Sequence, residues 1–226
     1  MGKAEKRVLG AILLGAVTVF ALGACGDGRI GPASTADDGQ PVPEQITAVR
    51  FDVPAGDVRI RVEPGAPVSF RRHLEYHGNK PGASHRVEGG TLVLASCGNN
   101  CAVDYDLVVP ARLPISGTAA AGAVEVTGAR TADVRAAAGK VTLRDVAGEA
   151  KVDSAAGDVD LTLSTPAAVK VKAAAGSIVV SVPGGPYRVD SQAMAGRTSV
   201  GVPTDPGAAN VLDLRSSAGD ITVKAA

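Results

Sequence analysis

The sequence predicts an all-β protein built around a parallel β-solenoid, a stack of β-helix-like repeats of about 17–23 residues. First, an Ala-Gly pair recurs through the C-terminal half at steps of 17, 18, 19, 20 and 23 residues. Second, alternate residues on both sides of each pair are aliphatic or small, the period of a β-strand. Third, hydrophobic residues make up 45% of the chain but aromatic residues only 3%, which favours a narrow, repetitive core.

The N-terminus predicts an exported protein. Lys3, Lys6 and Arg7 form a basic stretch, and residues 8–24 follow without a charge; this is the pattern of a signal peptide and is short for a membrane-spanning helix. Leu22-Gly23-Ala24-Cys25 resembles the lipobox of bacterial lipoproteins. The resemblance implies a signal peptide at 1–24, cleavage before Cys25 and a lipid on Cys25. We therefore expect an extracytoplasmic protein whose lipid anchors it in the cell membrane; an uncleaved anchor with an incidental cysteine is the alternative.

Residues 25–45 have few large hydrophobic side chains and are rich in Gly, Pro and small polar residues. This composition is typical of a flexible linker. We therefore expect a lipid-anchored flexible tether at 25–45 and a β-solenoid domain at 46–226.

A strand-rich lead-in segment is expected at 46–113, ahead of the repeats at 114–226. Residues 57–63 alternate aliphatic and charged side chains, and turn residues separate further alternating runs, which predicts hairpin-connected strands. Cys97 and Cys101 flank Gly98-Asn99-Asn100, residues that tolerate the positive φ of a tight turn. Because an exported chain meets an oxidising compartment, we expect a Cys97–Cys101 disulfide. The alternative is functional thiols, although the spacing is not C-x-x-C.

The three histidines, His73, His77 and His85, lie in one short segment. On one strand, residues four apart lie about 13 Å from each other, too far to share one metal ion. We expect solvated histidines, no metal site and no cofactor.

The repeats align on their glycines. The residues seven, five and three positions before each glycine, and two and four positions after it, predict the inward columns. The Ala directly before the glycine is expected to turn inward at a tight corner that only glycine permits. Charged residues fill the outward columns, where Lys140/Asp158 and Arg197/Asp220 are expected to pair between neighbouring coils. The aligned glycines are Gly122, Gly139, Gly157, Gly176, Gly196 and Gly219.

Composition and motifs exclude several functions. Basic and acidic residues number 23 each, so the chain lacks the excess of positive charge that coats nucleic acid. Few aromatic side chains are available to stack on bases or sugars. No nucleophile elbow, P-loop, H-E-x-x-H or dinucleotide fingerprint occurs, and the Gly-Asp steps at Asp57, Asp158 and Asp220 lack the spacing of a calcium repeat. We expect no catalytic residues and no nucleic-acid partner.

Residues 46–226 resemble the bacterial putative-adhesin domain family of unknown function, in its actinobacterial lipoprotein form. The resemblance rests on three features. These are the sequence Val-Pro-Ala-Gly-Asp-Val at 53–58, the Cys97–Cys101 turn before Val-Asp-Tyr at 103–105, and repeated units such as Ala-Gly-Asp-Val at 156–159. It implies a β-helical surface domain without catalytic residues.

Together these observations favour a non-enzymatic adhesion or scaffold module at the cell surface, whose partner is an unidentified envelope polymer or protein. The alternative is a ligand-binding accessory of an envelope-sensing system that uses loops 182–188 or 202–210. A polysaccharide-active β-helix enzyme is a third, weaker hypothesis.

Overall fold

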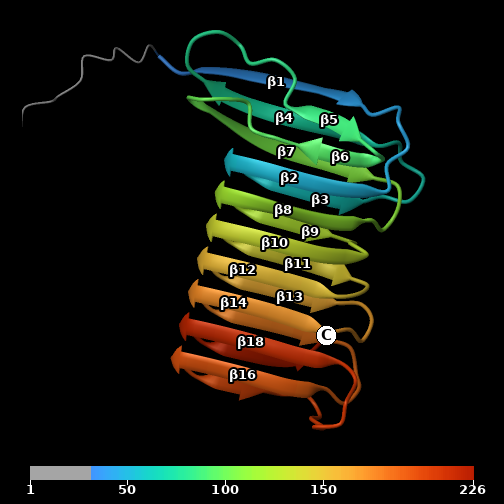
Figure 1. Cartoon of the computed structure of the whole chain (residues 1–226), viewed down its shortest axis with the longest axis vertical. Helices are drawn as coiled ribbons and strands as arrows, with labels where there is room; N and C mark the ends of the chain where they lie inside the picture. The colour runs from blue at the N-terminus through green and yellow to red at the C-terminus, as the bar shows by residue number, and fades with distance from the viewer. Residues whose placement is uncertain (1–31) are drawn as a thin grey trace, which may run out of the picture. The chain divides into compact units, whose positions relative to one another are not determined.

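The computed structural model describes residues 32–226. Within this range every regular secondary-structure element is a β-strand. The strands form two sheets that face each other across one hydrophobic core (Figure 1). The ten-stranded sheet A contains, in spatial order, β1 (Ser34–Pro41), β4 (Ser69–Tyr76), β7 (Cys101–Val109), β3 (Val58–Val62), β9 (Val124–Thr127), β11 (Val141–Val146), β13 (Val159–Leu163), β15 (Ile178–Val182), β19 (Ile221–Ala225) and β17 (Thr198–Val200). The nine-stranded sheet B contains β16 (Arg188–Ala195), β18 (Val211–Ala218), β14 (Val169–Ala175), β12 (Ala150–Ala156), β10 (Thr131–Ala138), β8 (Pro114–Ala121), β2 (Ala48–Ala55), β6 (Thr91–Leu94) and β5 (His85–Glu88).

The predicted parallel solenoid is confirmed. Each coil is a strand of sheet B, an Ala-Gly corner and a strand of sheet A, as in β12, Gly157 and β13. Strands of neighbouring coils pair in parallel and in register, so that Val152 lies between Val134 and Val171. Stacking therefore aligns equivalent residues of successive repeats into continuous columns. Figure 1 shows the strands of successive coils lying one below another along the front sheet.

The corner glycines are a steric requirement. A Cβ on Gly157 would lie 2.1 Å from the carbonyl oxygen of Gly139, and φ at Gly157 is 135°. The same clash repeats from corner to corner, because each glycine packs against the backbone of the one beside it. No L-residue side chain fits between corners spaced this closely.

The five predicted inward columns are buried in the interior coils. In the middle of the stack, Val152, Val159 and Leu161 are almost completely inaccessible to solvent. The prediction for the Ala before each glycine was wrong: Ala156 and its equivalents are exposed. The strand has already passed its last inward residue, Ser154, which is buried, and the chain turns with Ala156 on the outside.

The lead-in segment differs from the predicted hairpins. β2 and β3 already form a coil around Gly56, and they pair in parallel with β8 and β9. β6 and β7 pair in parallel with β2 and β3 on the other side. The stack therefore begins before the repeats at 114–226, and only β5–β6 is a hairpin of adjacent strands. Antiparallel pairing is limited to β1, β4, β5 and their neighbours, which cap this end.

The tether predicted at 25–45 was wrong for its second half. Ser34–Pro41 forms β1, an antiparallel edge strand that pairs with β4 along its whole length. Most of its side chains are exposed, so the sequence lacks the alternation that marks a strand. Its position depends instead on backbone pairing and on Asp38, described below.

The coils do not stack in chain order at the far end. The C-terminal coil, β18–β19, is inserted between β14–β15 and β16–β17, so the C-terminus lies within the stack (Figure 1). The terminal coil β16–β17 has polar residues, Ser191 and Thr198, in the inward columns. It also carries both exposed large hydrophobic residues of the described chain, Met194 and Val200.

Candidate functional site

The lipidation site predicted at Cys25 and the signal peptide predicted at 1–24 lie outside the described residues. Residues 32–226 contain no helix of the length and hydrophobicity that crossing a membrane requires. The remaining candidate sites are the disulfide corner, a buried polar cluster at the capped end, and the two outer faces of the stack.

A disulfide joins Cys97 and Cys101, whose Cα atoms are 5.8 Å apart. It closes the connection between β6 and β7, where the other coils carry an Ala-Gly corner. Gly98 and Asn100 adopt positive φ, as the tight-turn prediction requires. The disulfide thus occupies a structural corner of the coil next to Gly56.

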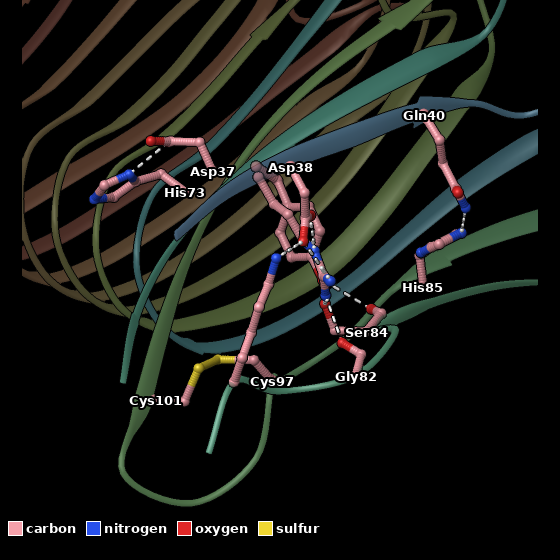
Figure 2. A network of polar contacts seen from close by, with 12 residues as sticks. Asp37, Asp38, Gln40, His73, Gly82, Ser84, His85, Cys97 and Cys101 are labelled. Atoms are coloured by element: carbon pink, nitrogen blue, oxygen red, sulfur yellow. Dashed lines mark hydrogen bonds and ion pairs between the residues drawn. A yellow bond between two sulfur atoms is a disulfide. The ribbon is translucent and has the colours of Figure 1, made fainter. Parts of the chain in front are cut away.

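Arg72 forms the centre of the buried polar cluster through contacts with Asp38, Gly82 and Ser84, which are labelled in Figure 2. Its side chain is only 8% exposed and makes a two-pronged ion pair with Asp38 of β1, with Nη2 3.0 Å from Oδ2. Nη1 also donates to the carbonyl of Gly82 and to Ser84 Oγ, both at 2.8 Å. The guanidinium beside Asp38 lowers the pKa of that carboxyl, and Lys80 adds to the effect. Arg72 therefore joins β1 and the 77–84 loop to the cap.

Tyr105 completes the cluster from β7. Its hydroxyl lies 2.5 Å from Ser84 Oγ, 2.7 Å from the Ser84 carbonyl and 2.8 Å from the Ala95 carbonyl. Burial raises the pKa of Tyr105, so the phenol stays protonated near neutral pH. Every polar group of this cluster is used in holding three segments together, which makes it a clamp and gives no basis for nucleophilic chemistry.

The histidines do not gather into a site. His73 Nδ1 lies 2.7 Å from Asp37 of β1, and this hydrogen bond raises the pKa of His73. His85 is half-buried, with its ring 4.3 Å from that of Phe70, and burial lowers its pKa; the expectation that it is solvated was wrong. Within residues 32–226, no three His, Cys, Asp or Glu side chains are grouped to hold a metal ion.

Charges on the outer face of sheet A are paired from coil to coil. Arg61 of β3 lies 3.2 Å from Asp106 of β7, and Lys140, directly before β11, pairs with Asp160 of β13. The predicted partner Asp158 is instead used at the corner, where its Oδ1 accepts the Ser177 N–H at 2.8 Å. In the other Gly-Asp pairs, Asp57 and Asp220 likewise accept a hydrogen bond from a backbone N–H of the neighbouring coil. The charged side chains on this face therefore connect each coil to the next.

The outer face of sheet B carries a shallow groove of about 560 Å³ that crosses β8, β10, β12, β14 and β18. Exposed alanines form its floor, including Ala137, Ala155 and Ala174. Long side chains stand along one side of the floor: Arg135, Asp153, Lys172 and Arg215. We call this feature the cationic groove.

The two loops predicted as alternative ligand sites pack against each other. Tyr187 N–H donates to the Pro203 carbonyl, and Asp205 N–H donates to the Tyr187 carbonyl at 2.9 Å. The Tyr187 ring is fully buried, and its hydroxyl donates to the Pro183 carbonyl. The loops therefore close the side of the terminal coil opposite its glycine corner.

Comparison with known proteins agrees with this architecture. Residues 115–224 match the model of a family described as Toastrack DUF4097. The match covers all of the coils from β8 onwards, and the resemblance to adhesin-like domains of unknown function is confirmed. No curated protein matches the chain.

A solved structure extends the likeness beyond residues 115–224. A putative cell adhesion protein from Clostridium sporogenes is 12% identical with a TM-score of 0.53, over 85% of this chain and 100% of the other. A putative adhesin from Bacteroides fragilis is 13% identical with a TM-score of 0.31, over 85% and 97% of the two chains. The first comparison shows a shared fold.

Sequence reasoning missed the clamp and the groove for different reasons. In the sequence, Arg72 is a charge that interrupts a run of apolar residues at alternate positions, and this is the available signal for a buried ion pair. Its partner Asp38 could not be found, because it lies 34 positions away in a segment without strand periodicity. The alignment of the repeats places the groove residues in outward columns, but only the register between coils shows which of them lie side by side.

Proposed function

We propose that this chain is a non-enzymatic adhesion or scaffold module held at the outer side of the cell membrane by a lipid on Cys25. The supporting observation is the uninterrupted stack of in-register coils, whose corner glycines and Gly-Asp steps serve to build a rigid body. Polar side chains of the buried cluster are all engaged in structure. The likeness to a putative cell adhesion protein supports the same role.

The position of β1 shortens the expected linker. Only residues 26–33 lie between Cys25 and the first strand, and an extended chain of that length spans at most about 30 Å. The proposed anchor would thus hold the capped end close to the membrane and leave the outer faces of both sheets available to an envelope polymer or protein.

The test combines anchoring with adhesion. The intact mass of the protein extracted from membranes should correspond to a chain that begins at a lipid-modified Cys25, and Cys25→Ser should remove the lipid and release the chain. Cells lacking the protein should adhere less or show a weakened envelope, and the wild-type gene should restore both. A membrane-extracted chain still starting at Met1, or deletion cells with normal adhesion and envelope integrity, would contradict the proposal.

A further inference from the structure

The cationic groove brings two cations without ion-pair partners within residues 32–226 onto one patch of sheet B. On sheet A, the arginines and lysines facing outward mostly meet a carboxylate of the next coil, as Arg61 meets Asp106. In the groove, Arg135 and Lys172 are exposed, and neither has an ion-pair or hydrogen-bond partner among the described residues. These two cations therefore lack an ion pair, although strands paired this closely bring the side chains of neighbouring coils within reach of each other.

The row contains three cations and one carboxylate, and Lys151 beside it is shared between that carboxylate and Asp133. Asp153 lies between Arg135 and Lys172 in the stack, and Lys151 lies 3.8 Å from its carboxylate. Arg215, beside Lys172, pairs with Asp213 of its own strand and donates to Gln192. Because neighbouring strands are about 4.8 Å apart, the cations Arg135, Lys172 and Arg215 span roughly 15 Å along the stack axis.

The floor beside this row is smooth and apolar. Ala137, Ala155 and Ala174 expose only methyl groups, and the floor continues past Ser217 towards Met194. Met194 lies on β16 between the register partners of Ser216 and Ala218, and it is 77% exposed. The largest exposed hydrophobic side chain of the described residues thus stands at the end of the cationic groove.

The backbone beneath the groove is already used in the parallel ladder from β8 to β16. A peptide strand therefore finds no unpaired backbone groups there, and recognition by strand addition is not available. The lining has no aromatic side chain on which a sugar ring could stack. What remains is attraction of repeated negative charges, with apolar contact along the floor.

We propose that the cationic groove binds an extended anionic polymer lying along the stack axis, with its phosphate or carboxylate groups at Arg135, Lys172 and Arg215. The inference deepens the proposed function, on which it rests, by naming the ligand class of the surface module. The rigid spacing of the coils favours a ligand whose charges repeat along an extended chain.

The experiment measures binding of the full-length protein to inorganic polyphosphate and to polygalacturonate, with neutral dextran as a reference. The double variant Arg135→Gln/Lys172→Gln should weaken binding about fivefold or more. It should also reduce the log–log salt slope by about 1.4, if each contact behaves as in a flexible polyanion. The matched control, Arg130→Gln/Lys224→Gln, removes two exposed, partnerless cations outside the groove and should change the affinity less than twofold.

A second variant tests the floor without removing a cation. Ala155→Glu places a carboxylate beside Arg135 and Lys172 and should weaken polymer binding as strongly as the double variant, while Ala155→Ser should not. A preference between polyphosphate and polygalacturonate identifies phosphate or carboxylate as the bound group. Absence of binding to both, equal losses in groove and control variants, or equally tight groove-dependent binding to anionic vesicles would overturn the polymer assignment.

Failure of this inference can be separated from failure of the proposed function. If cells lacking the protein lose adhesion while the purified protein binds neither polymer, the groove inference falls and the adhesion module stands. If the groove variants lose polymer binding while deletion cells adhere normally and keep an intact envelope, the groove inference stands and the adhesion role falls.

Discussion

The corner glycines make the sharpest prediction about stability, and Gly157→Ala is the best-placed change. Its Cβ would lie 2.1 Å from the Gly139 oxygen and 2.7 Å from the Gly139 carbonyl carbon. The corner must therefore move by about 1 Å to reach normal contact. On its other side, Gly157 N–H donates to the Ala175 carbonyl at 2.9 Å, so the movement strains or breaks that hydrogen bond.

The magnitude follows from three contributions. The positive φ of 135° costs a residue with a side chain about 1–3 kcal/mol. Overpacking adds about 1–3 kcal/mol, and a lost corner hydrogen bond about 1 kcal/mol. We expect a loss of about 3–7 kcal/mol in the free energy of unfolding, which lowers the melting temperature by about 10 °C or more.

Thermal and urea unfolding followed by far-UV circular dichroism would measure this loss. Two controls sharpen the test. Gly184→Ala should be neutral, because nothing lies within 4 Å of the added Cβ. Ala156→Leu should stay within about 0.5 kcal/mol, because the adjacent Ala156 is exposed. A Gly157→Ala protein that melts within about 2 °C of the wild type would refute the steric explanation of the corner.

Three further predictions concern the clamp, pH and the Gly-Asp steps. Arg72→Met should lower the free energy of unfolding by about 3 kcal/mol, because it removes the buried guanidinium from Asp38, Gly82 and Ser84 and leaves Asp38 with Lys80 alone. Urea unfolding measures this loss. An effect no larger than that of Arg71→Met, which removes an exposed arginine without a side-chain partner among residues 32–226, would contradict the clamp. The bond to Asp37 raises the pKa of His73, so its stabilisation is complete below the unfolded pKa near 6.5 and disappears as pH rises through the folded pKa. An NMR titration should place the His73 pKa above 6.5, and a normal pKa would count against the pair. Asp158→Ala should cost about 1 kcal/mol by freeing the Ser177 N–H, and an unchanged urea midpoint would argue that water replaces the carboxylate.

The sequence was informative wherever a residue's role repeats. The inward aliphatic columns and the Ala-Gly corners recur at every coil, so a single sequence contains several copies of the same signal. The Cys97–Cys101 turn could be read because its residue types favour positive φ. These features depend on local residue chemistry and on spacing, and both can be read directly from the sequence.

Features that depend on one long-range contact could not be predicted. β1 has the residues of a linker, and its strand exists because β4 offers an edge and Arg72 requires a carboxylate. Gly117 is another example: in its column the other interior coils have Val or Leu, but a Cβ there would lie 2.4 Å from the Phe51 ring. Only the register of β2 against β8 reveals that a large neighbour fills the space.

The exchanged order of the last two coils has a physical reason that was present in the sequence. The inward columns of β18–β19 hold Leu212, Leu214 and Ile221, whereas those of β16–β17 include Ser191 and Thr198. Stacking in chain order would bury the polar coil and leave the apolar one at the open end. Burial of each large aliphatic side chain contributes about 1.5–3 kcal/mol, which far exceeds the small cost of the longer connections at 183–187 and 201–210. The more apolar coil therefore takes the interior position, and the polar coil ends the stack where water meets it.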